Sequence, residues 1–122
     1  MEMRLELIPL PSTDVERSKA FYIDRVGFVL DHDVEPGNGM RVVQLTPPGS
    51  SCSIAIGVGF VDPSAAPVQS LHLVVDDVDL ARQTLLANGV DVSEVSDMGG
   101  GVRYAYFSDP DGNSWALQQI SR

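Results

Sequence analysis

The sequence predicts an α+β fold in which one βαβββ module occurs twice in tandem. Two stretches begin with residues that start helices and end at a glycine, and similar extended segments flank each of them. The chain has 122 residues, 43% of them hydrophobic and 20% charged, which is the size and balance of one globular domain. We therefore expect a single domain with module one at residues 4–58, a linker at 59–68 and module two at 69–121.

The first module is expected to open with a strand at residues 5–10, followed by a helix near residues 14–26. Thr13 and Glu16 have the spacing of a capping box. Gly27 suits the left-handed position that follows a helix. Two further strands, at residues 41–46 and 51–58, are separated by a turn that contains Pro47, Pro48 and Gly49.

The second module repeats this order. Its first strand, at residues 70–75, alternates Leu71 and Leu73 with Ser70 and His72, so the two pairs lie on opposite faces. A helix is expected near residues 77–88, with Asp76 as a good N-cap residue and Gly89 at its end. Strands at residues 103–107 and 114–120 flank a second proline- and glycine-containing turn.

The net charge of −9 excludes several classes of partner. Nucleic-acid binding needs Lys and Arg to neutralise phosphates, and an anionic membrane surface repels an acidic protein. No apolar run approaches the roughly 20 residues of a membrane span. One cysteine allows no internal disulfide, and the first ten residues do not read as a signal peptide, so we expect a cytoplasmic protein.

Three short motifs make the sequence resemble the vicinal oxygen chelate superfamily, which includes glyoxalase I, bleomycin-resistance proteins and extradiol dioxygenases. The motifs are D-V-E-R-S-K-A-F-Y at residues 14–22, V-D-D-V at 75–78 and D-P-D-G-N at 109–113. The resemblance implies two modules whose curved sheets form a cleft, with helices on one sheet face and the ligand on the other. It also implies a homodimer, since short two-module members commonly pair.

The resemblance implies a divalent metal ion in some members, held by His, Glu and sometimes Gln. The corresponding positions here are Leu7, Ser70 and Ala116, of which only serine offers even a poor ligand. We therefore expect no metal cofactor. The alternative is a displaced metal site built from His72, Gln118 and Glu6, which would make the protein a metal-dependent lyase, isomerase or dioxygenase.

The ligand-binding residues are predicted from strand alternation on the expected cleft face. The alternation predicts five polar residues that contact the ligand: Ser70, His72, Tyr104, Tyr106 and Gln118. Leu7 and Ala116 are expected to line the space that a metal ion would otherwise fill. Trp115 is expected in the core and His32 at a solvated edge. No catalytic triad or Cys-His pair has a recognisable context, so no catalytic residue is assigned.

These observations favour a metal-free protein of the bleomycin-resistance type that binds a small organic molecule. The tyrosines favour an aromatic ligand, and the negative charge favours a cationic one. A structural or regulatory module that uses the fold only for assembly is the third possibility.

Overall fold

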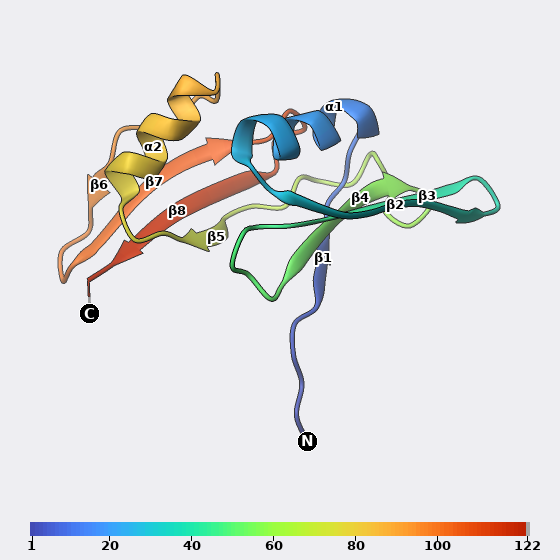
Figure 1. Cartoon of the computed structure of the whole chain (residues 1–122), viewed down its shortest axis with the longest axis horizontal. Helices are drawn as coiled ribbons and strands as arrows, with labels where there is room; N and C mark the ends of the chain where they lie inside the picture. Colours follow the sequence, from blue (N-terminus) through green and yellow to red (C-terminus); the bar gives the residue numbers. More distant parts are fainter. Residues whose placement is uncertain (122) are drawn as a thin grey trace.

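A computed structural model describes residues 1–121 and confirms the duplicated βαβββ order (Figure 1). The first module contains β1 (Leu7–Pro9), α1 (Val15–Ala20), η1 (Phe21–Val26), β2 (Val29–Gly37), β3 (Met40–Thr46) and β4 (Ser53–Val58). The second contains β5 (Leu71–Val74), α2 (Val78–Ala87), β6 (Ser96–Asp97), β7 (Val102–Ser108) and β8 (Ser114–Ile120).

The two modules form separate four-stranded sheets with the same topology. The strand orders are β1-β4-β3-β2 and β5-β8-β7-β6. In each sheet the first strand runs parallel to the last strand of its module, and the remaining pairs are antiparallel. This mixed pattern is an α+β arrangement and differs from a doubly wound parallel sheet.

Both helices begin at an aspartate, but the predicted capping interactions were wrong by one residue. Asp14 caps α1 by accepting a hydrogen bond from the Arg17 amide at 3.1 Å. Asp77, rather than Asp76, caps α2 by accepting one from the Leu80 amide at 3.0 Å. The two aspartates have extended backbones, as N-cap residues require.

The first helix changes its winding after Ala20. Residues 21–26 form a π-helical turn, and the amides of Gly27 and Phe28 both donate to the Tyr22 carbonyl. Gly27 ends the helix with φ of 93°, as predicted, because a left-handed backbone favours glycine. The turn places Phe21 and Tyr22 in the protein interior.

An aromatic cluster joins the two modules. Its rings come from the first helix, the residue before β2 and the second sheet: Phe21, Tyr22, Phe28, Phe107 and Trp115. Trp115 is 3% exposed, so the predicted core position is confirmed. Burying side chains of this size stabilises a fold by roughly 2–3 kcal/mol each, so this cluster contributes to holding the modules together.

A group of ion pairs fastens α1 to the first sheet. Arg41 on β3 contacts Glu16 at 2.6 Å and Asp33 at 2.7 Å, and Lys19 contacts Asp33 at 2.8 Å. Hydrogen bonds from Arg41 and then Lys19 hold the pKa of the Asp33 carboxyl well below its usual range. These pairs lie at the surface, so we assign them a positioning role rather than a large share of the stability.

Both helices lie above the sheets in Figure 1, whereas the N-terminal segment runs down from β1 on the other side. Leu71 and Leu73 pack against the core beneath the helices, and His72 and Val74 alternate onto the exposed face of β5. Each sheet therefore keeps one face that its own helix does not cover. Within the described residues no helix is long and apolar enough to cross a membrane.

Candidate functional site

The uncovered face of the second sheet collects most of the predicted binding residues. Ala116 on β8 pairs with His72 on β5 and with Tyr106 on β7, so these three residues form one row across the sheet. The next row on the same face contains Gln118 between Val74 and Tyr104. Strand alternation thus brings together His72, Tyr104, Tyr106, Ala116 and Gln118, which we call the aromatic face.

The three rings of the aromatic face are in contact. Tyr104 and Tyr106 stack with centroids 5.9 Å apart and planes 7° apart. His72 meets Tyr104 edge to face at 5.6 Å and 88°. Tyr106 is 42% exposed, whereas Ala116 is 1% exposed, so the rings form a surface above a closed floor. An exposed platform of this kind is suited to stacking against a flat apolar or cationic group.

Hydrogen bonds orient two of these side chains. The Gln118 amide donates to the Tyr104 hydroxyl at 2.9 Å, and Nδ1 of His72 lies 2.7 Å from the Ser70 carbonyl oxygen. Ser70 contributes to the aromatic face through its backbone. Its carbonyl oxygen contacts His72, and its amide donates to the Ser114 hydroxyl at 2.8 Å. The face therefore combines a rigid ring surface with several polar groups.

The remaining predicted residues lie in the first sheet or before it. Leu7 is on β1, paired with Ser53, and Glu6 precedes this strand, whereas His72 and Gln118 belong to the second sheet. Within residues 1–121 no three His, Cys, Asp or Glu side chains gather in a way that could hold a metal ion.

The donor set at the family's metal positions does not fit a divalent ion. Leu7 and Ala116 carry no ligand atom, and the Ala116 methyl is buried. The Ser70 carbonyl oxygen accepts the hydrogen bond of His72, and its hydroxyl would be the sole side-chain ligand. Divalent transition metals bind imidazole, carboxylate and thiolate groups far better than a single hydroxyl.

A polar network on the first sheet was missed by the sequence analysis. Ser53, which is 4% exposed, bonds the Thr46 hydroxyl at 2.6 Å and accepts from the Gln44 amide at 3.3 Å. Thr46 also donates to Asp31, and Gln44 contacts His32 at 3.2 Å. His32 does lie on an exposed edge strand, but it is tied into this network. The alternation of Gln44 and Thr46 with buried Val43 and Leu45 was the available signal.

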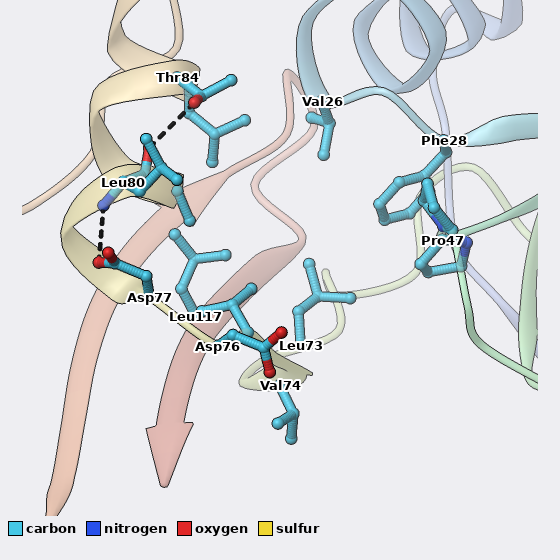
Figure 2. A pocket seen from close by; sticks show the side chains of 14 residues that line it. Val26, Phe28, Pro47, Leu73, Val74, Asp76, Asp77, Leu80, Thr84 and Leu117 are labelled. Atoms are coloured by element: carbon cyan, nitrogen blue, oxygen red, sulfur yellow. Dashed lines mark hydrogen bonds between the residues drawn. The ribbon is translucent and has the colours of Figure 1, made fainter. Parts of the chain in front are cut away.

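An apolar cavity of about 440 Å³ lies between the modules on the helix side (Figure 2). Val26, Phe28 and Pro47 of the first module form one wall, and β5 and α2 form the other. Asp76 and Asp77 are its acidic groups, and Asp77 is already engaged as the cap of α2. The rings of the aromatic face do not line it, so this cavity and the predicted binding surface are separate features.

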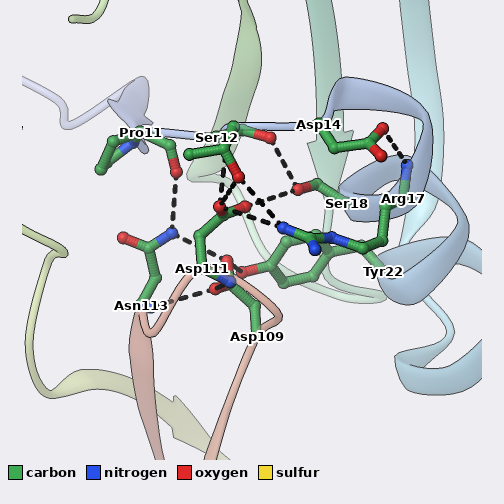
Figure 3. Close-up of polar contacts among 10 residues, drawn as sticks. Pro11, Ser12, Asp14, Arg17, Ser18, Tyr22, Asp109, Asp111 and Asn113 are labelled. Atoms are coloured by element: carbon green, nitrogen blue, oxygen red, sulfur yellow. Dashed lines mark hydrogen bonds and ion pairs between the residues drawn. The ribbon is translucent and has the colours of Figure 1, made fainter. Parts of the chain in front are cut away.

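The D-P-D-G-N motif makes a buried polar network rather than a ligand site (Figure 3). Both oxygens of Asp109 are used: one accepts from the amides of Asp111 and Asn113, the other from the Tyr22 hydroxyl and the Asn113 side chain. Asn113 also bonds Pro11 and Val68. Because these partners come from both modules, we call this group the turn network and assign it a structural role.

Asp111 extends the turn network to the start of α1. Thr13 donates to Asp111 through both its amide and its hydroxyl, and Ser18 donates at 3.1 Å. Burial alone would raise the pKa of Asp111, but these hydrogen bonds and the charge of Arg17 lower it below its usual value. The contacts explain why Thr13 does not serve in a capping box.

Tyr22 gives the turn network a measurable pH dependence. Burial, and then the Asp109 carboxylate, raise the pKa of the Tyr22 phenol far above its usual value of 10. Because the folded protein holds the proton of Tyr22 more tightly than the unfolded chain, Tyr22 contributes its full stabilisation below pH 10. This contribution decreases as the pH rises above 10. We expect the unfolding free energy to fall above pH 10 more steeply than in Tyr22→Phe, by about 1 kcal/mol more between pH 10 and 11. Urea unfolding at pH 9–11 measures this, and equal slopes would contradict it.

Comparisons with known proteins extend over both modules. The sequence matches the Glyoxalase/Bleomycin resistance protein/Dioxygenase superfamily over residues 4–117. TnmS3, an antibiotic binding protein from Streptomyces sp. CB03234, aligns with a TM-score of 0.85 and 36% identity, covering 98% of each chain. A glyoxalase/bleomycin resistance protein from the same Streptomyces aligns with a TM-score of 0.79 and 37% identity, covering 95% of this chain and 100% of the other.

A curated relative is similar over most of its length. YwkD, an uncharacterized protein of Bacillus subtilis (strain 168), is 30% identical over 113 aligned residues, and the match covers 85% of this chain and 87% of YwkD. This match therefore extends over most of both chains.

Proposed function

The chain belongs to the glyoxalase/bleomycin resistance protein/dioxygenase superfamily, and we propose that it is a metal-independent member that binds a small aromatic molecule. The observation that carries this proposal is the aromatic face, where Tyr104 and Tyr106 present stacked rings beside the polar groups of His72 and Gln118. Ligand sites commonly combine an apolar wall with a few well-placed hydrogen-bonding groups.

The description of TnmS3 as an antibiotic binding protein supports this proposal. That relative is similar over nearly the whole of both chains, so a binding role is compatible with this fold in a protein of almost the same length. The identity of the molecule is not transferred with the fold, because one scaffold hosts many functions.

The charge of −9 makes a cationic ligand the preferred one. We test this with calorimetry on two matched probes, 2-naphthylmethylamine and 2-naphthoate, which differ in the sign of their charge. The amine should bind more tightly, and its affinity should weaken as salt rises, since screening reduces the long-range attraction. Tighter binding of the carboxylate would refute the electrostatic part, and binding of neither probe would argue against a general aromatic site.

Metal independence is a separate prediction. The protein should retain no tight equivalent of Zn²⁺, Ni²⁺, Mn²⁺ or Fe²⁺ after loading and desalting, because Leu7, Ser70 and Ala116 supply no adequate ligand set. Elemental analysis of the loaded protein measures this, with His72→Ala as the comparison. One tight equivalent that disappears in this variant would instead support the displaced site of His72, Gln118 and Glu6, and with it a metal-dependent enzyme.

We further propose that the protein is a homodimer. Its open sheet faces expose apolar groups that a second copy can cover: Val34 and Val74 are 46% and 65% exposed. Light scattering at micromolar concentration should give about twice the chain mass of 13.1 kDa. A mass equal to that of one chain would contradict the dimer.

A further inference from the structure

The contact between His72 and Ser70 fixes which ring nitrogen of the neutral histidine carries the proton. Nδ1 lies 2.7 Å from the backbone carbonyl oxygen of Ser70. A carbonyl oxygen can only accept a hydrogen bond, so Nδ1 must be the donor. In the neutral ring the other nitrogen, Nε2, is then left with a lone pair and acts only as an acceptor.

The backbone of Ser70 is held in the conformation that makes this contact. Its φ is 61°, in the left-handed region where residues other than glycine are uncommon. Its amide donates to the Ser114 hydroxyl at 2.8 Å, that hydroxyl donates to Gln69 at 3.0 Å, and the Ser114 amide donates to Val68 at 2.9 Å. These bonds fix the peptide whose carbonyl accepts from His72, at the expense of an unfavourable backbone angle.

The rest of the imidazole is available for a ligand. His72 is exposed on β5, and Nε2 has no hydrogen-bond partner within residues 1–121. The ring is also held against Tyr104, edge to face at 5.6 Å. A ligand that stacks on the rings of the aromatic face would therefore lie beside a histidine with a fixed orientation.

We propose that His72 is the residue of the aromatic face that selects ligands by their hydrogen-bond donors. It accepts through Nε2 and so favours an aromatic molecule with a hydroxyl or N–H group over one with an ether or a carbonyl at the same place. Tyr104 complements it, because its hydroxyl accepts from Gln118 and keeps its own proton for donation. This inference rests on the proposed function and specifies that the aromatic ligand carries a hydrogen-bond donor.

The tautomer can be measured without any ligand. In long-range ¹H–¹⁵N correlation spectra, a protonated and an unprotonated ring nitrogen of a neutral histidine resonate far apart. We expect the His72 ring, at a pH where its spectrum shows it to be neutral, to carry its proton on Nδ1. His72→Ala assigns the signals, and His32→Ala serves as the matched control on the other sheet. A ring protonated on Nε2 would overturn the inference whatever the protein binds.

The selectivity is tested with 2-naphthol and 2-methoxynaphthalene, which share a ring system and differ in the donor. Calorimetry should show up to about 10-fold tighter binding of the naphthol, since one hydrogen bond changes an affinity by a factor of this order. His72→Phe keeps a flat ring beside Tyr104 but removes the acceptor, so it should abolish the preference, and His32→Ala should not.

The outcomes separate this inference from the proposed function. If both probes bind equally well and both lose affinity when the tyrosine rings are removed, the aromatic face is a binding site and the role assigned to His72 is wrong. If the preference for the naphthol persists in His72→Phe, another group accepts the hydrogen bond. If neither probe binds although the tautomer is the expected one, the proposed function fails and the hydrogen-bond assignment remains.

Discussion

Asp109→Ala is expected to lower the free energy of unfolding by about 3–5 kcal/mol, a large fraction of the stability of a chain of this size. Asp109 is 6% exposed and accepts four hydrogen bonds, from two backbone amides, the Tyr22 hydroxyl and the Asn113 side chain. The alanine variant leaves these buried donors without a partner, and each unpaired donor costs about 1–3 kcal/mol unless water reaches it. Urea unfolding at neutral pH measures the change.

Asp91→Ala is the matched control, because it removes the same carboxylate from an exposed position. Its effect should stay within about 0.5 kcal/mol, as for most surface substitutions. If Asp109→Ala were as mild as this control, the turn network would not connect the modules, and the motif would need another explanation.

The turn network shows why the motifs predict the fold well and the chemistry poorly. Residues 109–113 and the first turn of α1 resemble a family signature, yet in the structure Asp109, Asp111 and Asn113 bond to Tyr22, Thr13 and Pro11. The signature marks the contact between two modules. A motif whose polar atoms are all used internally has none left for a substrate, so its presence does not distinguish an enzyme from a binding protein.

Local patterns were sufficient for the order of elements and failed on the details of helix ends. Alternation in β5 and β8 and the glycines at the helix ends are properties of the chain itself, and they predicted both modules. Thr13 could not be recognised as a partner of Asp111, because the two residues are 98 positions apart. The π-helical turn at residues 21–26 likewise depends on how Phe21 and Tyr22 pack against the second sheet.

The candidate site was predictable to the same extent. Strand parity brought His72, Tyr104 and Gln118 onto one face, because it requires only a period of two. It could not indicate the left-handed backbone of Ser70, which fixes the proton of His72. It also missed the network around Ser53, since that network needs the register of three strands in the first sheet.

The largest effect on binding is expected when both rings of the platform are removed. The double variant Tyr104→Ala, Tyr106→Ala should weaken the binding of 2-naphthol on the order of 100-fold, since stacking contributes about 1–3 kcal/mol per ring. The two tyrosine rings stack with their planes 7° apart, so a flat ligand that stacks on one ring meets a surface that the other ring holds in place. Isothermal titration calorimetry measures the affinity, and circular dichroism confirms that the variant is folded.

The double variant Tyr104→Phe, Tyr106→Phe separates stacking from hydrogen bonding. It keeps both rings and loses both hydroxyls, so affinity should fall only about 10-fold or less, largely through the Tyr104 hydroxyl that Gln118 orients. If the phenylalanine variant loses as much affinity as the alanine variant, the hydroxyls rather than the rings bind the ligand. If neither variant changes the affinity, 2-naphthol binds elsewhere, and the cavity beside Leu73 and Leu80 on the helix side becomes the alternative site.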